Sequence, residues 1–452
     1  MRAVAVFPTR REVRVTSHPA PALDSPTAVE LRMLEVGVCG TDREICTFQY
    51  GTPPAGSDYL VLGHESLGEV TSVGRAVRDF KPGDLVVPMV RRPCDRPECA
   101  PCRAGRQDFC VTGEYRERGI RGAHGFMTER VVDDQRWMNR VPRALRDVAV
   151  LVEPLTIAEK ALLQLAALEE RLPESCRHRR PAADGAGAAR SGAAKSRASA
   201  RRGAASRKSS DGRPHRAVVL GAGPVGLLGA MALVEAGYDV MVYSRGTATS
   251  PRARVVSAIG AKFLSAEKHA VADLPRLAGN VDVIYEAVGA SSLAFEALHA
   301  LGPNGVFIFT GVPGRKGPIS VDTDRLMRDL VLKNQLLLGT VNAGRDAFEA
   351  AIRGLGSFLA RWPEAVRSLI TGRFAMESCM VPIQGGGDGI KSVIVIGEGG
   401  ARPVRNVAVA SATGGANTRE ASSSAPRRAR TVPARAPRRK PASAKAKRPR
   451  KR

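Results

Sequence analysis

A glycine-rich turn between an apolar run and a helical pattern constrains the fold of this chain more than any other segment. The run RAVVL at 216–220 leads into GAGPVG at 221–226, and LLGAMALVEAG follows at 227–237. A strand, a GxGxxG turn and a helix in this order form the context in which such a turn binds the pyrophosphate of a dinucleotide. The segment therefore predicts a nucleotide-binding unit.

The glycines of this turn have different tasks in a dinucleotide site. Gly221 permits the tight turn, Gly223 lets the backbone approach the pyrophosphate, and Gly226 allows the helix and the strand to pack closely. We therefore expect the cofactor to contact the turn residues Gly221, Gly223, Pro224, Val225 and Gly226.

Further strand-like runs follow the turn and alternate with helical stretches. They are DVMVYS at 239–244, VDVIYEAVG at 281–289 and GVFIFTGV at 305–312. This alternation predicts an α/β fold with a doubly wound parallel sheet, which we assign to residues 215–338.

The end of the run at 239–244 favours one form of the dinucleotide. An acidic residue at this place would bind the two ribose hydroxyls of NAD, whereas this chain has Tyr243, Ser244 and Arg245. A hydroxyl and a guanidinium suit a 2′-phosphate, so we expect NADP to be preferred, with Ser244 and Arg245 as contacts. The alternative is that Arg245 is an exposed loop charge and that NAD is accepted too.

The first ninety residues have a different pattern. Short valine-rich runs alternate with glycine and proline turns, and GEVTSVG at 68–74 and KPGDLVVP at 81–88 predict paired strands in a small barrel. Strand-like runs such as KSVIVIG at 391–397 return near the end of the segment 339–398.

Three potential metal ligands lie in this first part. Cys39 in GVCGTD is followed 25 residues later by His64 and Glu65. A thiolate, an imidazole and a carboxylate suit a zinc ion that acts as a Lewis acid with one open position. Asp42 is suited to accept the second ring N–H of His64, and the Thr41 hydroxyl could pass a proton toward solvent. We therefore treat Thr41, Asp42 and Glu65 as candidate catalytic residues.

A second group of cysteines predicts a structural zinc site. Four thiolates within 17 residues can close a tetrahedral site without an open position. Four residues, DRPE, separate the first two cysteines, so the loop must bulge to bring the first sulfur to the metal. The alternative is a reduced, partly vestigial lobe. The candidate ligands are Cys94, Cys99, Cys102 and Cys110.

Several motifs in a fixed order resemble the zinc-dependent medium-chain alcohol dehydrogenase family, and within it the branch similar to glucose 1-dehydrogenase. The resemblance covers roughly residues 1–170 and 215–397. The motifs are GVCGTD (37–42), GHE (63–65), KPGDLVV (81–87), the four-cysteine lobe (94–110), TGEYRERGIRGAHGFMTE (112–129), VEPL (152–155), GAGPVG (221–226) and TVN (340–342).

The resemblance implies a GroES-like β-barrel catalytic domain over 1–172, to which 339–398 returns. It makes Glu153 a further ligand of the catalytic zinc ion and lets Glu65 enter or leave the metal shell. Thr310, Asn342 and Lys391 would line the cofactor cleft. The residues expected to bind substrate are Thr41, Glu117, Glu153 and Asn342.

The implied substrate is a glucose-like aldose or a secondary alcohol. Polar residues in sugar-oxidising relatives are replaced here by Val90, Ile157 and Leu332, which argues for a less hydroxylated substrate or a sugar held differently. One alternative is a polyol or simple alcohol dehydrogenase of the same fold. Another is a nucleoid-associated protein whose oxidoreductase-like core has become a scaffold.

The net charge of +25 is concentrated in two stretches. Residues 173–214 carry 11 basic and 3 acidic residues, and residues 401–452 carry 16 basic and 1 acidic residue. Both lack apolar periodicity, so we expect a disordered linker at 173–214 and a disordered tail at 399–452. The tail is either a solvated appendage or an arm that contacts nucleic acid weakly and without sequence preference.

Other properties indicate where such a chain would work. No apolar run reaches the roughly 18 residues that span a bilayer, and the N-terminus reads as a strand rather than a signal peptide. Eight cysteines, half of them clustered as ligands, fit a reducing cytoplasm. We expect a homo-oligomer, either a dimer or a tetramer, with no membrane partner.

Overall fold

The computed structural model describes residues 1–173, 215–314, 317–385 and 389–396. The predicted disorder at 174–214 and 399–452 lies outside these residues. None of the described helices is both long enough and apolar enough to span a membrane.

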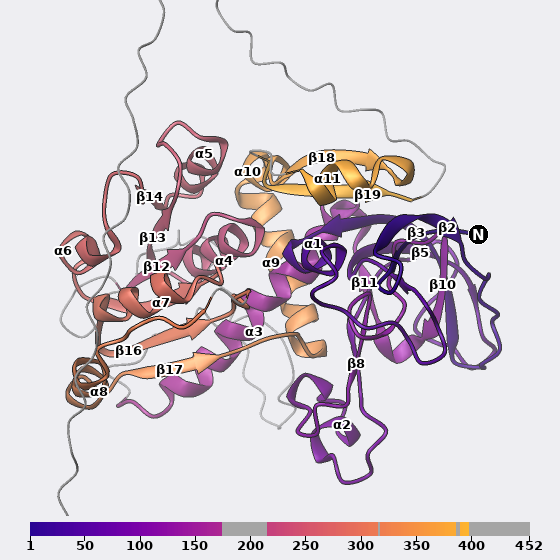
Figure 1. Ribbon diagram of the computed structural model, residues 1–452, viewed down its shortest axis with the longest axis horizontal. Helices are drawn as coiled ribbons and strands as arrows, with labels where there is room; N and C mark the ends of the chain where they lie inside the picture. The colour runs from indigo at the N-terminus through magenta and orange to yellow at the C-terminus, as the bar shows by residue number, and fades with distance from the viewer. Residues whose placement is uncertain (174–214, 315–316, 386–388, 397–452) are drawn as a thin grey trace, which may run out of the picture. The chain divides into compact units, whose positions relative to one another are not determined.

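The strands of the N-terminal part pair antiparallel, except for the parallel pair β18 and β19 that the end of the described chain adds (Figure 1). A three-stranded sheet has the order β2-β1-β4, and a seven-stranded sheet has the order β11-β6-β5-β3-β19-β18 with β10 paired to β3. The strands β5 and β6 pair antiparallel, as the two runs at 68–74 and 81–88 predict. The strands are β1 (Arg2–Phe7), β2 (Glu12–Ser17), β3 (Ala28–Val38), β4 (Leu60–Val61), β5 (Glu65–Val73), β6 (Leu85–Pro88), β10 (Arg130–Asp134), β11 (Met138–Val141), β18 (Ile370–Ala375) and β19 (Lys391–Val395).

The end of the described chain returns to this sheet. Strand β19 pairs antiparallel with β3, from Ser392 opposite Val38 to Val395 opposite Glu35. Val393 and Ile394 are fully buried, so the apolar content of the run at 391–397 is used in the core. Residues 391–395 therefore lie in the same sheet as the strands of the first part.

The predicted doubly wound sheet is also confirmed. Six parallel strands have the order β14-β13-β12-β15-β16-β17, and β12 in the middle is the strand that precedes the glycine turn. Strands buried on both faces read as continuous apolar runs, which is why RAVVL and its successors lack alternation. The strands are β12 (Arg216–Leu220), β13 (Asp239–Ser244), β14 (Lys262–Ser265), β15 (Val281–Glu286), β16 (Leu301–Phe309) and β17 (Leu336–Gly339).

Helices cover this sheet and connect it to the antiparallel part (Figure 1). The helix α3 packs against both α4 and α9, and a single core cluster contains buried residues from all three. The α-helices are α1 (Gly40–Cys46), α2 (Ala100–Arg103), α3 (Val152–Glu169), α4 (Pro224–Glu235), α5 (Pro251–Ala258), α6 (Leu274–Ala278), α7 (Ser291–Ala297), α8 (Thr323–Leu332), α9 (Arg345–Arg361), α10 (Pro363–Ser368) and α11 (Met380–Gln384).

Short elements build the cysteine lobe, which lies between β6 and β10 in the sequence. The lobe contains α2, the 3₁₀ turn η1 (Gln107–Phe109) and the small sheet β7 (Arg91–Arg92), β8 (Arg116–Arg118) and β9 (Gly122–Ala123). In this small sheet, β8 pairs antiparallel with β7 and parallel with β9.

Candidate active site

Three of the proposed metal ligands converge. Cys39 follows β3 and is the residue before α1, while His64 and Glu65 lie at the start of β5. One ligand atom from each lies within 4.8 Å of the others, and the Cys39 Sγ is 3.1 Å from the His64 Nε2. Gly63 has a φ of 89°, and a Cβ there would lie 2.6 Å from Val36 Cγ1, so the turn into His64 requires glycine.

Asp42 fixes the start of α1 beneath this group. Its Oδ2 accepts a hydrogen bond from the Cys39 backbone N–H at 2.9 Å, as in a helix capping box. Its Oδ1 lies 3.7 Å from the His64 Nδ1, which is a charge contact rather than the expected hydrogen bond. Thr41 lies on the first turn of α1 between Cys39 and Asp42.

Burial and the charge of the neighbouring residue shift the pKa values of Cys39 and His64 in opposite directions. Burial raises the pKa of the Cys39 thiol, and the neighbouring His64 lowers it in part. Burial works to lower the pKa of His64, but the charges of Cys39 and Asp42 outweigh it and hold that pKa well above its ordinary value. The ligands of a metal must be deprotonated, so metal affinity at such a site falls as the pH falls.

Lys391 is buried beside a candidate metal ligand. Its side chain is 1% exposed, and its Nζ donates to the Glu65 Oε2 and to the Val38 carbonyl at 3.3 Å. It pairs with the carboxylate of a candidate metal ligand, which the pattern KSVIVIG alone does not reveal. Its contact with the cofactor stays a prediction.

Glu153 lies near the three ligands but outside their 4.8 Å group. It opens α3, and burial raises its pKa to about 7, with His64 lowering that pKa and Glu65 raising it. The geometry therefore supports Glu65 as the third ligand atom in this arrangement and leaves Glu153 facing the same group.

Two of the four residues expected to bind substrate meet directly. The Asn342 Nδ2 donates to the Glu117 Oε1 at 2.9 Å, and both residues are buried. The same carboxylate oxygen accepts two hydrogen bonds from Arg91, at 3.1 and 3.0 Å. The Arg91 guanidinium lies 3.6 Å from the centre of the Tyr115 ring. Sequence reasoning missed Arg91, although it is the first residue of the pair Arg91–Arg92 before the first lobe cysteine.

In the glycine turn, one glycine allows close packing of the backbone and another leaves room for a ligand. A Cβ on Gly226 would lie 2.1 Å from the Gly221 carbonyl oxygen, whereas a Cβ on Gly223 would meet no atom within 4 Å. The open side of Gly223 is at the N-terminus of α4, where backbone N–H groups and the helix dipole favour an anion.

The loop after β13 carries the predicted specificity residues. Arg245 is exposed, and the Ser244 Oγ accepts a hydrogen bond from the Ala222 N–H at 3.3 Å, which ties this strand to the glycine turn. The Gly246 N–H donates to Glu267 at 2.9 Å, so a carboxylate lies beside the residue that follows Arg245. Sequence reasoning missed Glu267 because it comes 21 residues later, after β14.

Thr310 is held by the end of the neighbouring strand. Its hydroxyl donates to the Glu286 carbonyl at 2.7 Å. The buried Glu286 carboxylate accepts hydrogen bonds from the backbone N–H groups of Val288, Gly289 and Gly311. Glu286 thus joins the two loops that leave β15 and β16, at the carboxyl ends where open α/β sheets bind ligands.

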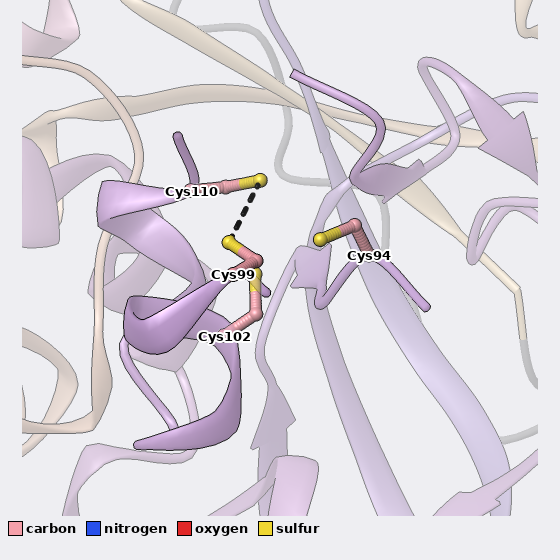
Figure 2. A group of neighbouring side chains, drawn as sticks. All are labelled: Cys94, Cys99, Cys102 and Cys110. Atoms are coloured by element: carbon pink, nitrogen blue, oxygen red, sulfur yellow. Dashed lines mark hydrogen bonds between the residues drawn. The ribbon is translucent and has the colours of Figure 1, made fainter. Parts of the chain in front are cut away.

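The four lobe cysteines also converge (Figure 2). One sulfur from each lies within 4.8 Å of the others, and the Cys99 Sγ is 3.9 Å from the Cys110 Sγ. The wide spacing between Cys94 and Cys99 therefore does not keep the first sulfur away from the group. All seven described cysteines are free thiols.

The three apolar residues aligned with sugar contacts separate in space. Val90 is buried in the core of the antiparallel part, and Ile157 is half-buried on α3. Leu332 ends α8 and is 70% exposed, before β17 begins, whereas Thr340 to Asn342 follow the other end of that strand. Leu332 and Asn342 therefore lie at opposite ends of β17, and the alignment of Leu332 with a sugar contact stays a prediction.

Known proteins match the chain over nearly all of its described length. The alcohol dehydrogenase GroES-like domain matches residues 25–143, and the glucose dehydrogenase C-terminus matches residues 191–396. Glucose 1-dehydrogenase of Methanocella arvoryzae is 36% identical over 400 residues, covering 88% of this chain and 100% of that protein. Its counterpart from Thermoproteus tenax is 38% identical over 357 residues, covering 78% of this chain and 88% of that protein.

The chain belongs to the zinc-dependent medium-chain alcohol dehydrogenase family. Within this family it lies in the glucose dehydrogenase branch. A solved structure of Haloferax mediterranei glucose dehydrogenase in complex with NADP, Zn and gluconolactone has a TM-score of 0.73 and 30% identity, covering 88% of this chain and 99% of that chain. The resemblance drawn from the ordered motifs is confirmed, as is the family's GroES-like and Rossmann architecture.

Proposed function

We propose that this medium-chain dehydrogenase is a zinc-dependent sugar dehydrogenase that oxidises an aldose, with glucose the first substrate to test, to its lactone. Hydride passes to NADP. The observation that carries the proposal is the convergence of Cys39, His64 and Glu65 in a chain whose relatives are glucose 1-dehydrogenases. The Haloferax relative binds NADP, Zn and gluconolactone together.

The donor set fits a catalytic zinc ion. A thiolate, an imidazole and a carboxylate are ordinary zinc ligands, and three protein ligands leave one position open for substrate. Cys39, His64 and Glu65 would hold the ion, with Glu153 beside them. A zinc ion bound here supplies Lewis-acid polarisation of the substrate oxygen and lowers the pKa of that hydroxyl.

The other residues bind and orient the reactants. Glu117 and Asn342 present a carboxylate and an amide that are already joined to one another, and these groups suit sugar hydroxyls. Thr41 passes the substrate proton toward solvent. Gly221, Gly223 and Gly226 hold the pyrophosphate at the start of α4, with Pro224 and Val225 in the same turn. Arg245 and Ser244 would bind the 2′-phosphate, and Thr310 would line the cofactor cleft.

The assay that tests this proposal follows NADPH absorbance with a panel of aldoses, polyols and simple alcohols, with NADP and NAD in parallel. An aldose oxidised faster than the polyols and alcohols, with NADP as the better acceptor, is the expected result. If a polyol or a simple alcohol is the best substrate, the polyol or alcohol dehydrogenase alternative replaces the sugar proposal. Oxidation of none of them by zinc-loaded enzyme contradicts both.

We further propose a homo-oligomer in the cytoplasm. Large apolar side chains are exposed on α8 and around β17, which supports burial of this surface against a second copy of the chain. Free thiols at all seven described cysteines support a reducing compartment. Light scattering on the purified chain gives the subunit number. The exposed apolar residues are Val312, Met327, Val331, Leu332, Leu337 and Val341.

The nucleoid-protein alternative depends on the basic stretches, which carry a charge of +23 between them. Counterion release from phosphates makes any such binding weak at high salt. We propose that DNA retention by the full chain falls steeply with salt and that a chain ending at Gly400 loses most of it. The shortened chain should keep its kinetic constants, and a loss of activity would make the tail part of the active enzyme.

A further inference from the structure

Lys160 is a buried cation that the proposed reaction does not use. It lies on α3, and its side chain is 5% exposed. Its Nζ is 3.1 Å from the Asp108 Oδ2 and donates to the Val341 carbonyl at 3.1 Å. It also lies 4.3 Å from the centre of the Phe109 ring. One ammonium group therefore joins helix α3, the cysteine lobe and the loop after β17.

The residues of that loop differ in their exposure. Thr340, Asn342 and Ala343 are buried, whereas Val341 is 51% exposed. A hollow of about 330 Å³ is lined by Lys160, Thr340 and Val341 among other residues. Asn342 has a φ of 58°, in the left-handed region that is unfavourable for residues with a Cβ. Three polar contacts hold this conformation, together with the packing of Ala343 in the core. They are the bond of Lys160 to the Val341 carbonyl, that of the Ala343 N–H to the Asn342 Oδ1 at 2.9 Å, and that of Asn342 to Glu117.

Asp108 extends the same support from the lobe. Its side chain is completely buried, and it accepts hydrogen bonds from Arg106 at 3.1 Å as well as pairing with Lys160. A Cβ placed on Gly344 would lie 3.0 Å from the Asp108 Oδ1, so the carboxylate packs directly against the end of the loop. Asp108 comes two residues before the candidate zinc ligand Cys110. The lobe thus touches the loop both directly and through Lys160.

We propose that the pair Asp108 and Lys160 is a latch that fixes the loop from Thr340 to Gly344 and so positions Asn342 against Glu117 for substrate. Lys160 is a positioning residue in this proposal, because it acts on the substrate through Asn342. The kinetic part rests on the proposed sugar dehydrogenase function. The structural part does not, since it concerns only how the loop is held.

The test uses the full chain with zinc bound and compares Lys160→Met, Lys160→Arg and the control Arg171→Met. Arg171, just after α3, also donates to two backbone carbonyls of the nucleotide-binding part, those of Asn304 and Asn334, but not to this loop. Lys160→Met leaves Asp108 paired with Arg106, which favours folding. Hydrogen exchange at Ala343 and steady-state kinetics with the best aldose are measured on each variant.

In Lys160→Met, hydrogen exchange at Ala343 should become faster and the KM for the aldose should rise. Each change should be about tenfold, because the variant loses roughly one hydrogen bond to a charged group. The kcat should change much less, and Lys160→Arg should recover part of both losses. The control should match the unaltered protein in both measurements. Unchanged exchange in Lys160→Met, or equal effects in the control, overturns the latch.

Two further outcomes are separated by the design. If the unaltered chain oxidises no aldose, the proposed function fails and the exchange rate at Ala343 alone decides the latch. If Lys160→Met does not fold, Lys160→Gln replaces it, because the amide can still donate to Val341 but cannot pair with Asp108 as a charge. Faster exchange in that variant supports the latch, and unchanged exchange overturns it.

Discussion

Glu117 and Asn342 share a hydrogen bond of 2.9 Å across a separation of 225 residues in the sequence. Glu117 belongs to the small sheet of the cysteine lobe, and Asn342 follows the last strand of the parallel sheet. Their contact joins the small sheet of the cysteine lobe to the loop after β17. This contact cannot be predicted from the local sequence around either residue.

Two substitutions of Asn342 separate its side chain from its backbone. Asn342→Gly keeps the left-handed conformation and loses only the amide, whereas Asn342→Leu loses the amide and is strained at positive φ. We expect the KM for the aldose to rise by about tenfold in Asn342→Gly and further in Asn342→Leu, since the Glu117 carboxylate loses a donor in both. Steady-state kinetics and thermal melting check this. An unchanged KM in both variants would remove Asn342 from the substrate site.

Removal of one ligand should empty the catalytic metal site. Cys39→Ser or His64→Ala is expected to abolish turnover and to lower the zinc content from about two ions per chain to about one, with the lobe site still filled. Cys46→Ser is the control, because Cys46 lies on the same short helix but in neither ligand group. Metal analysis, NADPH binding and activity are measured together. Full activity in either ligand variant is incompatible with the zinc mechanism.

Substitutions of two loop residues should change the affinity for NADP in opposite directions. Arg245→Ala should weaken NADP binding by about 1.5–3 kcal/mol, the range for a hydrogen bond to a charged group, and barely affect NAD. Glu267→Gln should strengthen NADP binding, because the carboxylate beside Gly246 repels a 2′-phosphate. Dissociation constants for both cofactors test the pair. Equal losses for NADP and NAD in Arg245→Ala would show that Arg245 does not contact the phosphate.

The His124 side chain should make the stability of the folded protein depend on pH. Burial, with the charges of His18 and Arg118, lowers the pKa of His124 from 6.5 to about 4. The His124 Nδ1 also accepts the Val61 N–H at 3.2 Å, which requires the neutral ring. Between pH 6.5 and 4 the unfolded chain binds more protons than the folded chain, so stability falls as the pH is lowered through this window.

His124→Asn should flatten that dependence, because its carboxamide oxygen can accept the Val61 N–H and does not titrate. The measurement is the difference in Tm between pH 7 and pH 5 for the variant and for the unaltered chain, with His269→Asn as a control in the nucleotide-binding part. We expect a smaller drop in His124→Asn only. The same drop in all three proteins would show that His124 does not titrate in this window.

The local sequence was sufficient for the elements and for the short-range ligand sets. RAVVL and DVMVYS are strands because they are buried on both faces, and the glycine turn between them has the close contacts that its pattern predicts. The cysteines of the lobe converge because their spacing within one short segment leaves them few other arrangements. The positive charge of the chain was correctly excluded as a guide to its core function, since it lies in two stretches outside the family motifs.

The tertiary structure decided which residues that are distant in the sequence form ion pairs and hydrogen bonds. Strand β19 inserts beside β3 and carries the Lys391 ammonium to Glu65, a contact that the local sequence does not reveal. Leu332 precedes β17, whereas Thr340 to Asn342 follow that strand, so residues close in sequence lie at opposite ends of one strand. Sequence spacing fixes what a helix or strand presents to its own neighbours, because those periods are short and regular. It does not fix the register and order in which strands meet, and the contacts of Lys160 with Asp108 and the Val341 carbonyl depend on these.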